Sequence, residues 1–117
     1  HMGNKYFTTV SWRKYLIPTT DRIIKFLDSR GVDVMNQISQ IIDEANRDSK
    51  KEVTVMIHPN LSSAILIKEK DYVEVLNICL DFLIKKEEYE KCSNIQLYKE
   101  KIKKNRTTSN KTTKSLI

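Results

Sequence analysis

Two segments of the chain alternate apolar and polar residues with the period of two that is typical of β-strands. The first covers residues 5–12, in which β-branched and aromatic residues predominate. The second covers residues 52–68, in which an alternating run precedes Pro59 and a second apolar run follows it. The pattern therefore predicts an N-terminal strand and a separate β-hairpin with its loop at residues 58–63.

The remaining apolar residues recur at three- and four-residue spacing, which predicts helices. Gly31 is a natural helix stop and divides the first helical stretch in two. The predicted helix at residues 70–85 is apolar nearly all round, so other elements must enclose it on several sides. A charged interruption at residues 85–88 favours two helices over one, although no Gly or Pro separates them. The predicted helices cover residues 20–30, 33–47, 70–85 and 87–104.

This order of elements predicts the α+β class, with a small antiparallel sheet packed against about four helices. The sheet would combine the N-terminal strand with the hairpin at residues 52–68. The chain of 117 residues fits one domain, which we place at residues 1–104. The first two residues, His1 and Met2, resemble a cloning scar and are not considered further.

The net charge of +6 comes entirely from the last 19 residues. Residues 1–98 carry equal numbers of basic and acidic side chains, whereas residues 99–117 carry seven basic residues against Glu100. From residue 105 onward the chain is polar and Thr-rich, which predicts a disordered basic tail. Such a segment attracts phosphate or an acidic partner. The basic residues concerned are Lys99, Lys101, Lys103, Lys104, Arg106, Lys111 and Lys114.

A nucleic-acid-binding regulator is therefore one functional hypothesis. The order helix, Gly31 turn, helix and hairpin resembles a winged helix-turn-helix, whose second helix enters the major groove. The predicted second helix at residues 33–47 is rich in carboxylates, however, and these oppose an approach to DNA phosphates. Nucleic-acid binding would thus rest mainly on the basic tail.

The chemistry-bearing residues indicate no enzyme, cofactor or metal site. His58 is the one histidine outside the cloning scar. It could act as a general base, but no nucleophile neighbours it in sequence, so a structural role in the hairpin loop is favoured. Cys79 and Cys92 lack the spacing of a zinc or redox motif, which indicates buried thiols in a reducing compartment. The longest apolar run is too short to span a bilayer, and no leader is evident. A cytoplasmic location follows as the expectation.

Aromatic residues provide candidate contacts for a protein partner, because Trp and Tyr are enriched at interface hot spots. Those at the N-terminal edge and in the last predicted helix are Trp12, Tyr15, Tyr89 and Tyr98. The nearly all-round apolar character of the third predicted helix also suggests a homodimer through residues 70–104, in which a second chain completes its burial.

One local family resemblance lies near the end of the predicted domain. Tyr89-Glu90, Cys92-Ser93, Ile95 and Ile102 are similar to the aromatic-Glu, small-small, aliphatic pattern of the UVR helical hairpin of bacterial excision-repair proteins. That hairpin is an interaction module, so the resemblance implies that residues 82–102 form a docking hairpin. The chain departs from the pattern at Gln96-Leu97, where the family has Arg-Asp.

These observations together favour a small, non-enzymatic adaptor, inhibitor or regulatory subunit that binds another protein. The alternative is the nucleic-acid-binding regulator that uses the basic tail. A usage rich in Lys, Ile and Asn indicates an AT-rich genome, bacterial or phage.

Overall fold

A three-stranded sheet and a layer of helices make up the computed structural model, which describes the backbone of residues 8–56 and 63–115 and the side chains of residues 9–56 and 64–105. This confirms the α+β class. The elements are β1 (Thr8–Ser11), α1 (Arg13–Leu16), α2 (Asp21–Arg47), β2 (Glu52–Met56), β3 (Ser63–Lys68), the 3₁₀ turn η2 (Glu69–Asp71), α3 (Tyr72–Lys85) and α4 (Tyr89–Ser115).

The strands lie in the order β1-β3-β2. β2 pairs antiparallel with β3, which places Val55 opposite Ile65 and confirms the hairpin. β1 pairs with the other side of β3 in the parallel direction, with Val10 opposite Ile65. The sheet is therefore mixed, and the expectation of a purely antiparallel sheet was wrong. The alternation of apolar residues fixes which face of a strand is buried, but it is the same for either pairing direction.

A single helix, α2, replaces the two helices predicted on either side of Gly31. The buried stripe continues through the glycine at helical spacing, from Leu27 through Gly31 to Val34 and Ile38. Gly31 is needed there because the ring of Phe82 on α3 packs onto its backbone; a Cβ at this position would lie 2.2 Å from Phe82 Cζ. The glycine permits a close helix contact and does not end the helix.

The two C-terminal helices are separate, as the charged interruption predicts. Glu87 has a left-handed backbone conformation, with φ of 60°, directly after α3. The amide of Glu88 donates to the carbonyl of Leu83 at 2.9 Å, which closes the end of the helix. α4 then continues helically through Ser115. The disorder expected of residues 105–117 stays a prediction.

The hydrophobic core lies between the sheet and the helices and encloses α3 within one chain. Val75, Leu76, Cys79 and Leu83 of α3 have no accessible surface. The helix packs against both α2 and α4. Most of the apolar circumference of α3 is thus covered within one chain, although Ile84 is 46% exposed. The homodimer through residues 70–104 stays a prediction.

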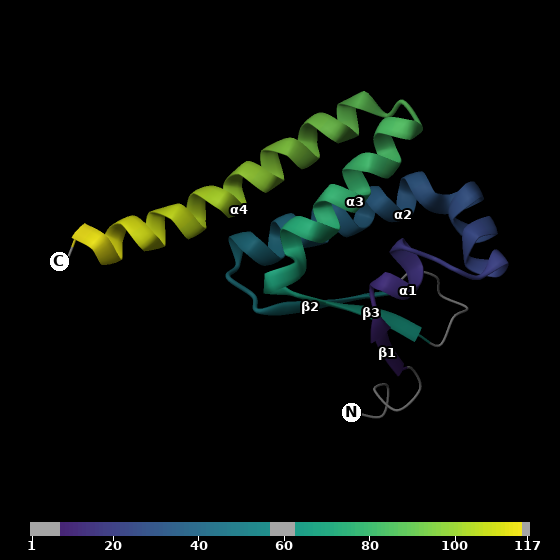
Figure 1. Ribbon diagram of the computed structural model, residues 1–117, viewed down its shortest axis with the longest axis horizontal. Coiled ribbons are helices and arrows are strands. Elements are labelled where there is room, and N and C mark those ends of the chain that lie inside the picture. Colours follow the sequence, from purple (N-terminus) through teal and green to yellow (C-terminus); the bar gives the residue numbers. More distant parts are fainter. Residues whose placement is uncertain (1–7, 57–62, 116–117) are drawn as a thin grey trace.

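Only one face of the sheet is covered by the long helices, which lie together on one side of it (Figure 1). In β2, Val55 is buried towards the helices, whereas Thr54 and Met56 point the other way and are exposed. The paired positions of the other strands share this outward side. We call it the open face; its residues are Thr9, Ser11, Glu52, Thr54, Met56, Ala64, Leu66 and Lys68, of which Ala64 has no accessible surface.

Candidate functional site

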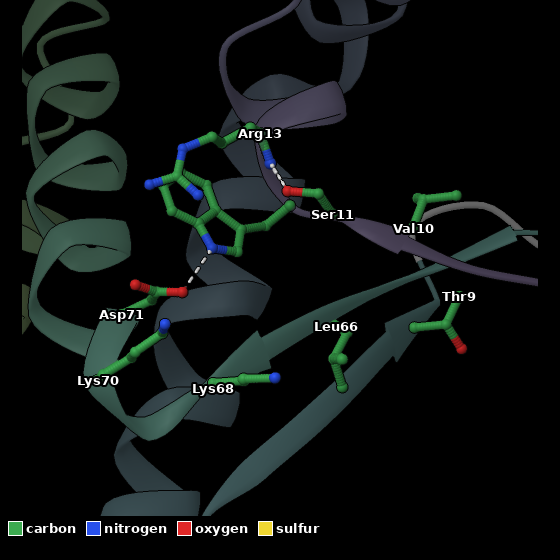
Figure 2. A pocket seen from close by; sticks show the side chains of 9 residues that line it. Thr9, Val10, Ser11, Arg13, Leu66, Lys68, Lys70 and Asp71 are labelled. Atoms are coloured by element: carbon green, nitrogen blue, oxygen red, sulfur yellow. Dashed lines mark hydrogen bonds between the residues drawn. The ribbon is translucent and has the colours of Figure 1, made fainter.

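A pocket of about 400 Å³ lies at one end of the open face, where β1 and β3 end side by side (Figure 2). Because β1 and β3 are parallel, both strands finish at the same end of the sheet. β1 continues into α1, and β3 continues into η2. We call this the Trp12 pocket. Its lining residues are Thr9, Val10, Ser11, Trp12, Arg13, Leu66, Lys68, Lys70 and Asp71.

The indole of Trp12 forms the rigid wall of the pocket. Its side chain is only 2% exposed, and Nε1–H donates a hydrogen bond to Asp71 Oδ2 at 3.2 Å. Asp71 stands at the N-cap position of α3, but its carboxylate makes no capping bond. The carboxylate instead joins η2 to the end of β1 across 59 residues of sequence. The pocket is therefore built from core packing as well as from surface side chains.

Arg13 covers the outer side of that indole. Its guanidinium carbon lies 4.2 Å from the centre of the Trp12 ring, a cation–π arrangement. One guanidinium nitrogen also lies 3.5 Å from Glu74 Oε1, and the Arg13 amide donates to Ser11 Oγ at 3.2 Å. An ion pair this exposed contributes little stability, but it orients the guanidinium, whose other donors stay available.

The rim of the pocket is positively charged. Lys68 and Lys70 are exposed, and neither forms an ion pair with another residue in the described part of the chain. Figure 2 shows both lysines on one side of the pocket, with Ser11 and Arg13 on the other. Among the described residues that line the pocket, Asp71 is the only acidic one, so three cations face one carboxylate. The arrangement favours an anionic group.

The four aromatic residues predicted to contact a partner do not form one surface. Trp12 and Tyr15 belong to the hydrophobic core and are 2% and 6% exposed. Tyr98 is half-buried; burial, followed by the charge of Asp43, raises the pKa of its hydroxyl. Tyr89, in contrast, is 61% exposed at the start of α4. Trp12 thus has a place in the candidate site as a wall of the pocket and not as an exposed anchor.

The basic residues near the C-terminus all lie on α4. Lys103 and Lys104 are exposed and Lys99 is half-buried. Lys101 Nζ lies 3.7 Å from Asp43 Oδ1 on α2 and 5.8 Å from the centre of the Tyr98 ring. Arg106, Lys111 and Lys114 are on the helical backbone, and their side chains fall outside the described residues.

The helix-turn-helix considered as an alternative for residues 20–47 does not form, because α2 is continuous through Gly31. The winged-helix interpretation was therefore wrong, although the hairpin on which it also relied is present. The predicted role of His58 lies outside the described residues. Residues 82–102, to which the UVR resemblance applies, span the last turn of α3, the connection and the first half of α4.

Both cysteines are buried, and neither forms a disulfide with a described residue. Burial raises the pKa of the Cys79 thiol to about 12. Burial, with a smaller contribution from the charge of Glu88, also raises the pKa of Cys92. Thiolates are the nucleophilic form of cysteine, so neither side chain is set up as a nucleophile at neutral pH.

We expect Cys79 to resist thiol reagents in the native protein at pH 8, because a pKa of about 12 leaves roughly one thiol in ten thousand ionised. Timed reaction with a disulfide dye, followed by mass spectrometry of the labelled peptides, measures this. Cys92 should react sooner than Cys79, and guanidinium should make the two rates equal. Rapid native labelling of Cys79 would contradict the packing around α3.

The described residues contain neither a metal site nor a membrane-spanning helix. No group of three or more His, Cys, Asp and Glu side chains there could hold a metal ion. Within the same residues, every helix is too short or too polar to cross a membrane.

No protein-family model, curated protein or solved structure matches the chain. The UVR resemblance therefore stays a prediction carried by a few residues of α4.

The residues that line the Trp12 pocket are not recognisable as a group in the sequence. They come from two short segments, residues 9–13 and 66–71, that are more than 50 positions apart. Neither segment contains a recognisable binding motif. The one available signal was the combination of a tryptophan and an arginine at the end of the first predicted strand.

Proposed function

We propose that the protein is a small, non-enzymatic binding protein, an adaptor or regulatory subunit, whose open face and Trp12 pocket dock an acidic segment of a partner protein. The observation that carries this proposal is the pair of exposed lysines, Lys68 and Lys70, beside a rigid indole at the end of a sheet face that no long helix covers.

The open face offers apolar contacts next to these charges. Met56 is 43% exposed and Leu66 is half-buried. Thr54 pairs with Leu66 and is exposed on the same face. A segment lying along the strands would bury Met56 and Leu66 while an acidic side chain enters the pocket. Interfaces of this kind obtain specificity from charge complementarity and affinity from the desolvated apolar centre.

Binding without catalysis is supported by the chemistry of the described side chains. The Cys79 thiol, with its pKa of about 12, is held in the unreactive form. In the Trp12 pocket, the Asp71 carboxylate accepts the indole hydrogen bond and Ser11 Oγ accepts the Arg13 amide. These groups orient their neighbours. The buried reduced thiols also support the cytoplasm as the proposed location.

A display selection tests the proposal even though the partner is unidentified. Random peptides on phage would be selected against the immobilised full chain at ~150 mM salt, where exposed charges more than a Debye length apart are screened. The peptides that bind should be enriched in Asp and Glu with one or two apolar residues. Neutral or basic binders, or no binders, would contradict the proposal.

Two matched variants then locate the binding. The double replacement Lys68→Ala/Lys70→Ala should weaken the selected peptides by at least about tenfold. The replacement Lys103→Ala/Lys104→Ala removes the same net charge from exposed positions on α4 and should leave the affinity within about twofold. If both variants weaken binding equally, the attraction is non-specific and the Trp12 pocket is not the site.

A second candidate function, nucleic-acid binding, is favoured by a different observation. α4 is helical through Ser115 and extends well beyond the sheet (Figure 1), so the basic C-terminal residues lie on one continuous helix. Fluorescence anisotropy of labelled DNA and RNA tests it with the same two variants. Here the replacement of Lys103 and Lys104 should weaken binding and that of Lys68 and Lys70 should not. Binding that disappears at physiological salt would remove this candidate.

A further inference from the structure

The charges around the Trp12 pocket are better matched to a dianion than to a single carboxylate. Arg13 of the lining pairs with Glu74 just outside it, so Lys68 and Lys70 are the two lining cations that form no ion pair with another described residue. A phosphate monoester carries about −1.5 to −2 at neutral pH, whereas a carboxylate carries one negative charge. A bound phosphate could therefore pair with both of these lysines, whereas the single charge of a carboxylate would match one of them.

The donor groups also suit a tetrahedral anion. Lys68 and Lys70 end in compact ammonium groups on flexible stems, which can each approach a different oxygen. The fork of Arg13 is partly engaged by Glu74 at 3.5 Å, so its planar two-point recognition of a carboxylate is compromised. The two lysines on one side of the pocket and Arg13 on the other could each contact a different oxygen of a phosphate ester.

Contacts of the neighbouring acids leave the two lysines available to a ligand. Asp71 accepts the indole hydrogen bond of Trp12 at 3.2 Å, which ties its Oδ2 atom to the wall of the pocket. Glu69, which lies between the two lysines in sequence, forms an ion pair with Lys51 at 3.4 Å. The N-terminus of α3 begins directly after Asp71, and its partial positive charge adds to the field of the pocket.

We infer that the Trp12 pocket binds the phosphate group of a phosphorylated side chain on the partner protein. This inference rests on the proposed function, because the open face beside the pocket would hold the rest of the segment. The binding of the partner would then depend on its phosphorylation state.

Three degenerate peptide pools test the inference, each with four random residues on either side of a central phosphoserine, glutamate or serine. Retention on the full chain would be measured at ~150 mM salt, where screening suppresses long-range attraction. We expect the phosphoserine pool to be retained at least tenfold more than the glutamate pool. The Lys68→Ala/Lys70→Ala variant should lose this preference, and the Lys103→Ala/Lys104→Ala variant should keep it. Circular dichroism would confirm that both variants fold.

The outcomes separate the inference from the proposed function. Equal retention of phosphoserine and glutamate pools, both dependent on Lys68 and Lys70, would overturn the inference and leave an acidic partner in place. If neither pool depended on these lysines, both proposals would fail. Competition with inorganic phosphate distinguishes the source of the anion. Phosphate that displaces the peptides at equal concentration would overturn the assignment to a protein side chain, since the pocket would then recognise a free ion.

Discussion

Replacing Trp12 with alanine should lower the free energy of unfolding by about 3–5 kcal/mol, the usual cost of truncating a buried tryptophan. The side chain is 2% exposed in the core and also holds Asp71 through its N–H group. Small domains have only about 5–15 kcal/mol of stability in total. The variant should therefore lose a large fraction of its stability and unfold at a much lower urea concentration. Urea titration followed by circular dichroism measures the effect.

Two further variants separate the contributions of Trp12. Trp12→Phe keeps an aromatic ring but loses the indole N–H, and should cost about 1–2 kcal/mol because Asp71 is left without its donor. Lys14→Ala, at an exposed neighbour in α1, is the control and should stay within about 0.5 kcal/mol of the parent. If Trp12→Ala were as stable as Lys14→Ala, Trp12 would not be the buried wall of the pocket.

Replacing Gly31 with alanine should also destabilise the protein, by about 1–3 kcal/mol, through overpacking. The added Cβ would lie 2.2 Å from Phe82 Cζ, so the half-buried ring would have to move. Alanine is a better helix former than glycine by about 1 kcal/mol, which opposes this effect. The clash should outweigh the gain, and urea unfolding would show a lower midpoint.

In a protein that already carries Phe82→Ala, the replacement Gly31→Ala should stabilise the fold and not destabilise it. With the ring absent, the alanine at position 31 meets no clash and should stabilise α2 by up to about 1 kcal/mol. Arg30→Ala, at the exposed adjacent position, should change little in either background. A Gly31→Ala effect that is the same with and without Phe82 would show that the two residues are not in contact.

The elements themselves were largely predictable because each carries its own periodicity. The hairpin of β2 and β3 follows from alternating valines and isoleucines on either side of a turn. The separation of α3 from α4 follows from a charged interruption, even though the residue in the left-handed conformation is Glu87 and not a glycine. In these cases the local signal and the tertiary packing agree.

Gly31 shows where local reasoning fails. A glycine within a helical pattern resembles a stop, since it costs about 1 kcal/mol in a helix interior. The packing of α2 against α3 overrides that preference, because Phe82 needs a position without a side chain. The apolar spacing from Leu27 to Ile38 does continue through the glycine, and greater weight on that spacing would have predicted one helix.

The candidate site was less predictable than the fold for a related reason. The parallel pairing of β1 with β3 joins segments that are distant in sequence, and neither segment specifies its partner strand or direction. Trp12 was identified as a candidate contact, but its burial and its bond to Asp71 follow only from that pairing. Lys68 and Lys70 became candidates only once the structure placed them beside Trp12 and Arg13.

The most direct test of the binding site is the indole N–H signal of Trp12 in a two-dimensional ¹⁵N–¹H spectrum. The chain has one tryptophan, so this signal reports on the pocket without ambiguity. During titration with an acidic peptide from the display selection, the signal should shift saturably, with the same dissociation constant as the amides of Leu66 and Lys70. An unmoved indole signal, with shifts confined to α2 or α4, would contradict binding at the Trp12 pocket.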